Sequence, residues 1–511
     1  MSRKVRVRFA PSPTGPLHIG GVRTALFNYL FAKKHNGTFI LRIEDTDRTR
    51  FVEGAEKYIR QALSWCGIKP DESTEKGGDF GPYRQSERKE LYKKHALLLV
   101  REGKAYYAFD KADELDEMRK RLTEEGSSIR HYNAFTRDKM RNSFTMSEEE
   151  VQKRLDNGET YVIRFNMPTD REIVMTDIVR GTVKVNTKEL DDKVLFKSDG
   201  LPTYHLANVT DDYHMKISHV IRGEEWLPSL PLHYLLYESL GWKDAMPEFA
   251  HLPLLMKPNG KGKLSKRDGE KMGFPVFPLE WKDPKSGETS AGFREDGYLP
   301  EAFLNLMALL GWNPGTDKEI FSLDELIENF DLNRVSKGGA KFSPDKAKWF
   351  NEEYLKKYNT SELARLYMPL FEERGMKVEK DYLIKVLEQM HERITLLPDL
   401  FEEADFFFKT PEEYNPKVVK KRWKENTPEH LKAIGEALEK LPEEQFNSEN
   451  TGKTVKQYIQ SNELGFGAIL NPVRLVLTGT GGGPHLFDIM EMIGKKETLL
   501  RIEKGLNEIS K

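Results

Sequence analysis

The N-terminal part of the chain has a strand–helix–strand pattern, which constrains the fold more than any other feature of the sequence. Val5, Val7 and Phe9 alternate with basic residues, as in a β-strand. Apolar side chains then recur at helical spacing over residues 22–30, and residues 39–43 have the composition of a second strand. Two strands joined through a helix favour a parallel sheet, so we expect an α/β fold.

Two opposite charges fall at the carboxyl ends of these predicted strands. Arg8 lies near the end of the first strand, and Glu44 directly follows the second. Ligands of parallel sheets bind beyond the carboxyl ends of the strands. The pair therefore predicts a crevice that suits a zwitterionic ligand.

The rest of the chain divides into regions of different character. A length of 511 residues is too great for a single core and indicates several domains. From residue 110 a charged, helix-rich stretch and short alternating strands indicate an insertion, and the sheet signals resume over residues 217–255. From residue 300 to the end almost all apolar spacing is helical, so the last third is predicted to be all-α.

Composition excludes several classes of protein. Cys66 is the single cysteine, which excludes an internal disulfide framework and thiolate zinc sites. We find no apolar run near the ~20 residues that span a bilayer, and the early first strand leaves no room for a targeting peptide. We therefore expect a cytoplasmic protein. The net charge of −2 gives no global field that would attract a polyanion, so any nucleic-acid partner would have to be bound by local basic patches.

A His-Ile-Gly-Gly sequence marks the start of the first predicted helix, at residues 18–21. A helix N-terminus offers free backbone N–H groups to a phosphate, small residues allow close approach, and an imidazole can donate to a phosphate oxygen. An incidental histidine at a helix entry is the alternative that this short motif leaves open.

A second short motif is the basic loop at residues 261–267, Lys-Gly-Lys-Leu-Ser-Lys-Arg. A solvated basic loop is its simplest interpretation. Glycines beside lysines also suit a mobile loop that brings ammonium groups onto a polyphosphate when it closes.

Taken together and in this order, the two motifs resemble the HIGH and KMSKS signatures of class I aminoacyl-tRNA synthetases. Residues 8–15, 41–48, 204–208 and 220–226 look like the corresponding blocks of the bacterial-type glutamyl-tRNA synthetases. Residues 472–479 also look family-like, so the resemblance extends over nearly the whole chain. It implies a glutamate–tRNA ligase that forms glutamyl-adenylate from glutamate and ATP and then transfers glutamate to the 3′-terminal adenosine of tRNA(Glu).

The resemblance also implies a domain order. A Rossmann-like parallel-sheet catalytic domain would carry an inserted α+β acceptor-end-binding domain and be followed by an α-helical anticodon-binding region. The expected limits are 1–109 and 201–262 for the two catalytic halves, 110–200 for the insertion, 263–345 for the KMSKS loop and stem-contact domain, and 346–511 for the anticodon-binding region.

Residue roles follow from the same resemblance. His18, Lys263 and Lys266 are the expected catalytic residues. Glutamate would be bound by residues that combine guanidinium, hydroxyl, amide and carboxylate groups, namely Arg8, Ala10, Ser12, Glu44, Tyr204, Asn208 and Arg222. The expected ATP-binding residues are His18, Gly20, Gly21, Glu225, Leu255, Lys263, Ser265 and Lys266.

The expected partners are tRNA(Glu), L-glutamate, and ATP with Mg²⁺; no membrane is expected, and the chain is predicted to be a monomer. The expected tRNA-binding residues are Asp45, Asp47, Arg393, Lys420, Arg422 and Trp423. For the basic residues around Trp423, a solvated helix face with a half-buried indole is an equal alternative.

The sequence departs from the family pattern in four ways. The fourth HIGH position is Gly21, and the second KMSKS position is Leu264. The cysteine-rich zinc site of some relatives has no counterpart, so zinc is not expected. Residues 272–292 are extra sequence that we expect to be a surface loop. A glutaminyl-tRNA synthetase and a synthetase-like adenylyltransferase stay open as alternatives, as does charging of tRNA(Gln).

Overall fold

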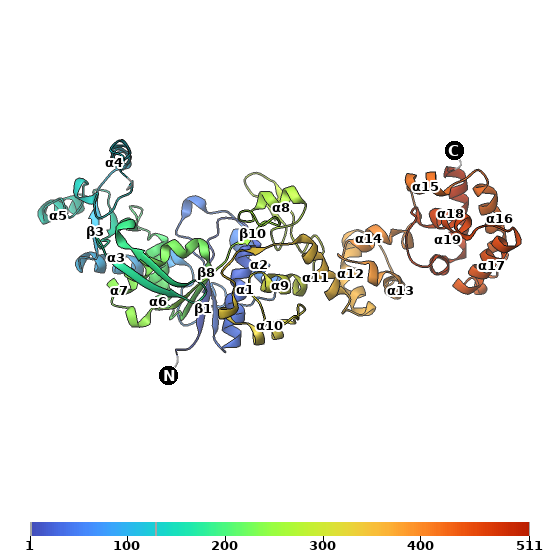
Figure 1. Cartoon of the computed structure of the whole chain (residues 1–511), viewed down its shortest axis with the longest axis horizontal. Coiled ribbons are helices and arrows are strands. Elements are labelled where there is room, and N and C mark those ends of the chain that lie inside the picture. The colour runs from blue at the N-terminus through green and yellow to red at the C-terminus, as the bar shows by residue number, and fades with distance from the viewer. Residues whose placement is uncertain (1–2, 128–129, 510–511) are drawn as a thin grey trace. The chain divides into compact units, whose positions relative to one another are not determined.

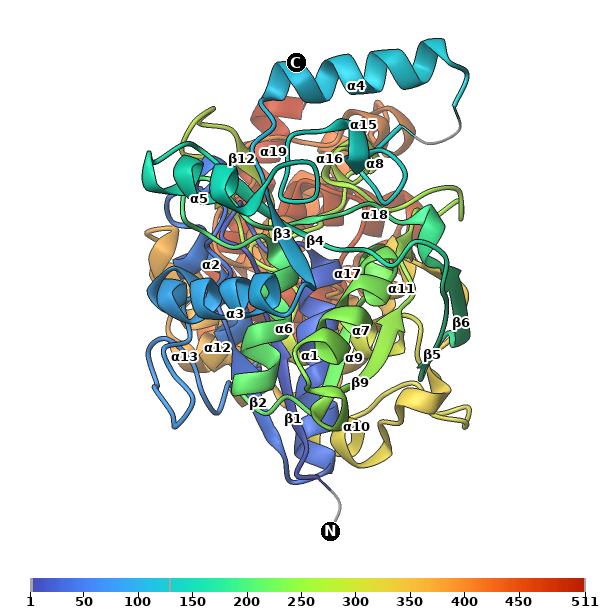
Figure 2. The same cartoon turned by 90° about the vertical axis from the view of Figure 1, so that its left-hand side faces the viewer.

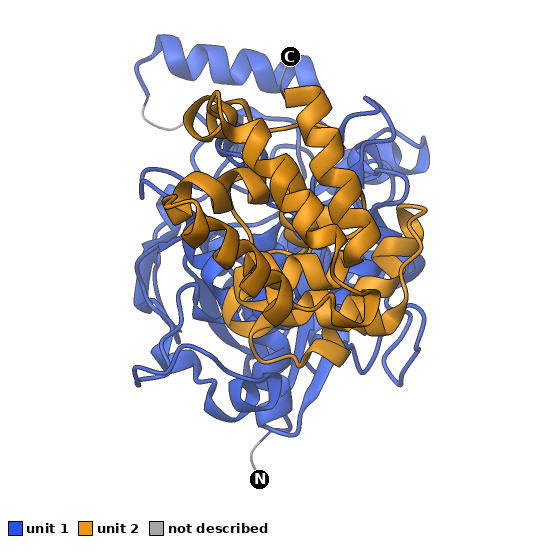
Figure 3. Ribbon diagram, turned by 90° about the vertical axis from the view of Figure 1, so that its right-hand side faces the viewer, with its two compact units in different colours: residues 1–295, 299–350 blue, residues 296–298, 351–511 orange. Residues whose placement is uncertain are grey.

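The computed structural model describes residues 3–127 and 130–509, and the outer limits predicted at residues 1 and 511 lie outside this described part. The chain divides into two compact units (Figure 3). The first comprises residues 1–295 and 299–350, and the second residues 296–298 and 351–511.

The N-terminal strand–helix–strand unit is present as predicted. Strand β1 (Arg6–Phe9) and strand β2 (Thr38–Leu41) pair in parallel, with Arg8 opposite Ile40, and helix α1 (Ile19–Lys34) connects them. Both strands are buried along their whole length, as expected of a parallel sheet covered on both faces.

The second half of the parallel sheet is also where the sequence predicts it. Strand β8 (His219–Gly223) and strand β9 (Glu248–Leu252) pair in parallel, and helix α7 (Leu230–Ser239) lies between them in the sequence. The backbone N–H of Ser218 donates to the carbonyl of Arg6 at 2.8 Å, which joins β8 to β1. The carboxyl ends of β1, β2 and β8 thus meet at one edge. Strands β1 and β8 lie next to each other in Figure 1.

The stretch predicted as an insertion contributes to two sheets. Strands β3 (Ala105–Ala108), β4 (Val162–Phe165) and β7 (Val194–Phe196) form an antiparallel sheet beside helices α4 (Ala112–Glu124) and α5 (Glu148–Asp156), as Figure 2 shows. The hairpin of β5 (Glu172–Asp177) and β6 (Gly181–Asn186) instead extends the large sheet, in the order β6-β5-β9-β8. The five domain limits stay predictions.

Four further helices complete the part of this unit that surrounds the sheet. They are α2 (Ala55–Trp65), α3 (Lys89–Arg101), α6 (Tyr204–His214) and α8 (Lys266–Met272). Beyond them come β10 (Leu255–Met256), which pairs with β13 (Ala340–Lys341), and α9 (Pro300–Leu309), α10 (Leu323–Asn329) and α11 (Pro344–Leu355).

Much of the extra sequence at residues 272–292 is buried, so the expectation of a surface loop is wrong for its first half. Five of its apolar side chains lie in the core, and strands β11 (Trp281–Lys282) and β12 (Thr289–Ser290) form a short hairpin whose tip is exposed. The Tyr58 hydroxyl donates to the Leu279 carbonyl at 2.5 Å and accepts from the Leu279 N–H at 3.1 Å. The buried apolar residues are Phe274, Val276, Phe277, Leu279 and Trp281.

The second unit is helical throughout residues 351–509, as predicted for the last third of the chain. Helix α19 is interrupted at Gly494, where φ is 81°. No helix in the described part of the chain is long and apolar enough to cross a membrane. The helices are α12 (Thr360–Glu373), α13 (Lys380–Met390), α14 (Asp399–Glu403), α15 (Pro416–Arg422), α16 (Thr427–Glu439), α17 (Ser448–Ser461), α18 (Phe466–Thr478) and α19 (Leu486–Ile509).

The buried ion pairs of Arg42 are expected to contribute strongly to the stability of the first unit. Its side chain is fully buried and pairs with Glu44 and Asp212. Removal of the cation leaves buried carboxylates uncompensated, so Arg42→Met is expected to lower the free energy of unfolding by about 3–5 kcal/mol. Urea denaturation followed by tryptophan fluorescence measures this, since every tryptophan except Trp423 lies in this unit.

The matched control for this prediction is Arg119→Met, which removes an exposed ion pair with Asp116 on helix α4. This change is expected to leave the unfolding curve unchanged. Equal effects of the two substitutions would contradict a stabilising role for the buried pairs.

Candidate functional site

All residues predicted to bind the amino acid line one pocket at the carboxyl edge of the sheet, which we call the arginine pocket. They come from β1 and the loop after it, from the turn after β2, from the start of α6 and from the end of β8. The pocket thus gathers residues that lie more than 200 positions apart in the chain. Its lining includes Arg8, Ala10, Ser12, Glu44, Tyr204, Asn208 and Arg222.

Arg8 is held by a carboxylate that the sequence did not reveal. Its Nε and Nη2 donate to the two carboxylate oxygens of Asp212 at 3.0 and 3.2 Å. Arg42 donates to the same carboxylate at 2.7 Å. Although burial alone would raise the pKa of Asp212, the guanidinium groups of Arg8 and Arg42 lower it below its usual value. Asp212 is therefore an anion shared between two arginines.

Glu44 faces the same network from the other side. Its Oε1 accepts from Nη2 of Arg42 at 3.0 Å, whereas no described residue donates to Oε2. Burial raises the pKa of Glu44 above its usual value, against the effect of Arg42 and Arg8. With its amide oriented to satisfy both neighbours, Asn208 donates to Asp212 at 3.2 Å and accepts from Arg42 at 3.1 Å.

Arg222 is positioned differently from Arg8. Its Nη1 donates to the Tyr204 hydroxyl at 2.6 Å, and its Nε donates to Nε2 of His251 at 3.0 Å. Because the Tyr204 oxygen accepts this bond, its own hydrogen is free for a ligand. Within the described part of the chain, no carboxylate forms a direct ion pair with Arg222.

A second pocket lies around His18 and adjoins the first, since Gly20, Gly21 and Glu225 line both. We call it the His18 pocket. Of the residues predicted to bind ATP, all except Lys266 line it. They are His18, Gly20, Gly21, Glu225, Leu255, Lys263 and Ser265.

The His18 ring has a defined tautomer. Its Nδ1 accepts from the N–H of Gly20 at 3.2 Å, and burial, with a smaller effect of Lys263, lowers its pKa to about 4. At neutral pH the ring is therefore uncharged and carries its hydrogen on Nε2. No described residue accepts from this buried Nε2. It is the group in this pocket that most clearly needs a ligand oxygen.

The expectation of free N–H groups at the start of α1 is wrong. The N–H of Ile19 donates to the Val276 carbonyl at 3.0 Å, and that of Gly20 is taken by His18. The helix start is thus closed by residues of the chain itself. The positive end of the helix dipole stays beside the pocket, but hydrogen bonds to a ligand depend on His18 rather than on these two amides.

Packing explains the glycine at the fourth HIGH position. A Cβ on Gly21 would lie 2.5 Å from Cδ1 of Leu17, so a larger residue would displace that side chain. Leu264, at the second KMSKS position, is buried, which fits an apolar residue of similar volume to methionine.

Two lysines of the basic loop form exposed ion pairs. Nζ of Lys263 lies 3.7 Å from Glu225, and Nζ of Lys266 lies 3.6 Å from Glu270. Lys266 is the first residue of α8 and lines neither pocket. Ser265, directly before it, does line the His18 pocket, so Lys266 lies next to that pocket, and the closing of the loop stays a prediction.

Sequence reasoning missed several residues around these pockets. Asp212 and Arg42 lie within or beside family-like blocks, but nothing in the sequence pairs them. Phe277, from the extra segment, packs its ring edge-to-face against His18 with centroids 6.1 Å apart. Five apolar side chains within the eight positions 274–281 were the one signal that this segment is buried.

The predicted tRNA-binding residues lie in two separate regions, and Asp45 is largely buried among them. In the first unit, Asp45 accepts from the N–H and hydroxyl of Ser86, and Asp47 accepts from the N–H of Thr49. Hydrogen bonds from Thr49 and then from Arg50 lower the pKa of Asp47 to about 2. Asp47 therefore organises its own turn, whereas Asp45 ties that segment to Ser86.

In the second unit, Lys420 and Arg422 lie in the last turn of α15, and Trp423 caps it. The Trp423 ring packs against the core of the helical bundle and is partly exposed. Arg393 is exposed in a separate turn.

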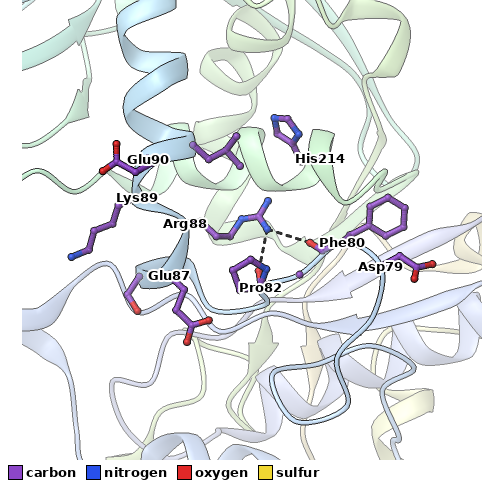
Figure 4. Close-up of a pocket in the computed structure, with 11 residues that line it drawn as sticks. Asp79, Phe80, Pro82, Glu87, Arg88, Lys89, Glu90 and His214 are labelled. Carbon is purple, nitrogen blue, oxygen red and sulfur yellow. Dashed lines mark hydrogen bonds between the residues drawn. The ribbon is translucent and has the colours of Figure 1, made fainter.

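Another pocket is lined by none of the predicted site residues (Figure 4). There the Arg88 side chain donates to the carbonyls of Phe80 and Pro82, at 3.2 and 3.0 Å. Its Nε donates to Asp211 at 2.7 Å, and thereby anchors α6. Among residues 3–127 and 130–509, no group of three or more His, Cys, Asp or Glu side chains could hold a metal ion.

Comparisons with known proteins agree with this geometry. Residues 4–349 match the family described as tRNA synthetases class I (E and Q), catalytic domain, and residues 362–506 match an anticodon binding domain. Glutamate–tRNA ligases of Christiangramia forsetii and Flavobacterium johnsoniae are 55% and 57% identical over 509 residues, with 100% of both chains covered.

A solved structure is also similar over the whole chain. It is a glutamate tRNA ligase from Elizabethkingia meningosepticum in complex with its amino acid, and it is 51% identical with a TM-score of 0.93. The match covers 99% of the present chain and 100% of that one.

The lowered pKa of His18 gives a direct test of the His18 pocket. Because the pKa is about 4, the ring stays neutral at pH 5.5, where an ordinary histidine with a pKa near 6.5 is mostly protonated. NMR titration of ¹⁵N-labelled histidine rings measures this, with His18→Gln to assign the signal. A His18 midpoint near pH 6.5 would contradict the buried, Nε2-protonated ring.

Proposed function

The chain belongs to the glutamate–tRNA ligases, which are class I aminoacyl-tRNA synthetases, and from this premise we propose how its two pockets divide the reaction. The enzyme joins L-glutamate to tRNA with the use of ATP. The arginine pocket binds glutamate, and the His18 pocket binds ATP. The observation that carries this division is that the seven predicted glutamate residues line one pocket and that seven of the eight predicted ATP residues line its neighbour.

In the arginine pocket, Arg8 binds the γ-carboxylate together with Tyr204 and Asn208. Asp212 occupies Nε and Nη2 of Arg8, and no described residue accepts from Nη1. That donor is available for a charge-assisted bond to the substrate. Glutamine would place a neutral amide there and leave the buried cation poorly satisfied, which favours glutamate.

Arg222 binds the α-carboxylate, and Glu44 with Ser12 binds the amino group. Support for the first role is the absence of a direct carboxylate partner for Arg222 among the described residues. Support for the second is Oε2 of Glu44, to which no described residue donates. The two substrate charges thus meet side chains of opposite sign, and this fits the zwitterion expected from the sequence.

In the His18 pocket, Nε2 of His18 donates to an ATP phosphate oxygen, and Leu255 and Glu225 lie near the adenosine. Magnesium enters with the ATP phosphates as part of the substrate and offsets their charge. The α-carboxylate of glutamate attacks the α-phosphorus of ATP. The bond from this phosphorus to pyrophosphate breaks, and glutamyl-adenylate forms. Lys263, Lys266 and His18 stabilise the negative charge on the phosphate oxygens.

In the second step, the terminal 2′-hydroxyl of tRNA(Glu) attacks the carbonyl of the adenylate, and AMP leaves. The helical unit binds the anticodon region through the basic end of α15, with Trp423 offering its exposed ring face to a base, and through Arg393. Asp45 and Asp47 shape the loop that faces the acceptor end. A monomeric state and a cytoplasmic location belong to the same proposal.

Aminoacylation of purified tRNA tests the proposed function. The enzyme is expected to charge tRNA(Glu) with glutamate in preference to glutamine. Replacement of Arg8 by Gln is expected to lower kcat/KM for glutamate by at least ~10²-fold, since it removes a charge-assisted contact. Preferential charging with glutamine would favour a glutaminyl enzyme, and adenylate formation without tRNA charging would favour an adenylyltransferase. A parallel assay with purified tRNA(Gln) reports whether that tRNA is also a substrate.

The matched control is Arg6→Gln on the same strand. Arg6 forms a bidentate pair with Glu72 at 2.8 Å and does not line the arginine pocket. It is therefore expected to retain charging. Loss of charging in both variants would show that a general effect on β1, rather than recognition of the γ-carboxylate, explains the loss with Arg8→Gln.

Lys266 tests whether the lysine loop closes. Although it lies outside both pockets, Lys266→Ala is expected to lower the kcat of aminoacylation by ~10²-fold, because it removes a cation from the transition state. Lys271→Ala, on the exposed side of the same helix, is expected to have no effect. Unchanged kcat in Lys266→Ala would mean that α8 does not bring this lysine to ATP.

A further inference from the structure

The guanidinium of Arg222 is fixed at every nitrogen. Nη1 donates to Tyr204 at 2.6 Å, Nη2 to the Trp226 carbonyl at 3.3 Å, and Nε to Nε2 of His251 at 3.0 Å. The side chain is 5% exposed, so it has little freedom to move. Its support comes from Tyr204 on α6, from His251 on β9 and from the turn after β8, so it depends on how α6 and the two strands are aligned.

Behind Arg222 lies a fully buried His–Asp pair. His251 is directly opposite Arg222 in the parallel pairing of β8 with β9. Its Nδ1 lies 2.6 Å from Oδ2 of Asp177, the last residue of β5. The other oxygen of Asp177 accepts from the N–H groups of Val179 and Arg180, at 3.0 and 2.8 Å. A chain of hydrogen bonds thus crosses three neighbouring strands.

The direction of these bonds follows from their chemistry. Arg222 can only donate, so Nε2 of His251 is the acceptor and the imidazole hydrogen lies on Nδ1, facing Asp177. Burial, together with the charge of Arg222, lowers the pKa of His251, and the ring is therefore neutral. Burial opposes ionisation of Asp177, but the hydrogen bond from His251 lowers its pKa below the usual value.

The acceptor that holds Arg222 is the neutral ring of His251, so it leaves the charge of the arginine in place, whereas a carboxylate would offset it. Arg8 shares Asp212, and its charge is largely offset inside the protein. Arg222 is held just as firmly, but the nearest anion on this path, Asp177, is one imidazole ring away. Arg222 therefore keeps its full positive charge for a ligand while its geometry is fixed.

We propose that His251 and Asp177 are positioning residues that hold Arg222 in the orientation needed to bind the α-carboxylate of glutamate without neutralising its charge. This inference rests on the proposed function. His251 does not touch the substrate; it acts through Arg222, and Asp177 acts through His251 by fixing its tautomer.

The decisive comparison is between His251→Gln and His251→Glu, because the two new side chains have the same size and differ in charge. The Gln side-chain oxygen can accept from Nε of Arg222 and preserves the charge of the arginine. The Glu carboxylate can accept as well, but it pairs with Arg222 directly and competes with the substrate. We expect the KM for glutamate to be at least tenfold higher in the Glu variant than in the Gln variant, with the KM for ATP unchanged within twofold.

A third variant distinguishes loss of the hydrogen-bond acceptor of Arg222 from a change in the charge beside it. His251→Leu removes the acceptor and is expected to raise the KM for glutamate about tenfold over the wild type, with Gln restoring most of the loss. His95→Leu is the matched control, since His95 is a buried histidine bonded to His214 that lines neither pocket. It is expected to leave both KM values unchanged, and melting temperatures show that each variant is folded.

Equal glutamate KM values for the Gln and Glu variants would overturn the proposal, as would equal rises in the KM for glutamate and for ATP. The first result means that the charge of Arg222 is not what His251 protects. The second result means that His251 supports the fold alone. Failure of the wild-type enzyme to charge glutamate would instead overturn the proposed function, so the two failures are distinct.

Discussion

The geometry of the arginine pocket depends on the buried ion pairs of Arg42. This fully buried guanidinium, just beyond the end of β2, lies against Asp211 and Asp212 of α6 and against Glu44 in the turn that follows its own strand. The carboxylates outnumber Arg42, but Arg8 and Arg88 complete the balance, because each pairs with one aspartate of α6. Burial of so many charges is tolerable only when each has partners, so the strands and α6 have to meet in one arrangement.

This balance leaves specific polar atoms of the arginine pocket without a partner among the described residues. Asp212 takes two nitrogens of Arg8 and leaves Nη1, Arg42 takes one oxygen of Glu44 and leaves the other, and Tyr204 accepts from Arg222 and keeps its own hydrogen to donate. The groups that face the pocket are therefore already oriented before a ligand arrives. Such preorganisation lowers the cost of binding a small, highly charged amino acid.

The two motifs that first indicated the function are linked through sequence that matches neither. Val276 accepts from the first amide of α1, and Phe277 packs on His18, while the same segment follows α8 directly. Tyr58 holds the segment to α2 through both backbone groups of Leu279. A shift of α8 that carries Lys266 toward ATP would therefore act on the segment that positions the His18 ring.

Local pattern was enough for much of this protein. The strand–helix–strand start, the return of the sheet at β8 and β9, the helical last third and the motif residues that line both pockets could all be predicted, because each depends on spacing within a few residues or on a short block. The sequence by itself therefore determined the class of fold, the family, and most of the side chains that line the two pockets.

Only the tertiary structure decided how those side chains are held. The partnership of Arg42 with Asp212 spans 170 positions, that of His251 with Asp177 spans 74, and the β5–β6 hairpin joins the large sheet from within a stretch that reads as an insertion. The burial of residues 274–281 likewise depends on Tyr58 and α1. Buried polar groups form hydrogen bonds with whichever groups the packed sheet brings close to them. The distance between two residues along the chain does not reveal which groups these are.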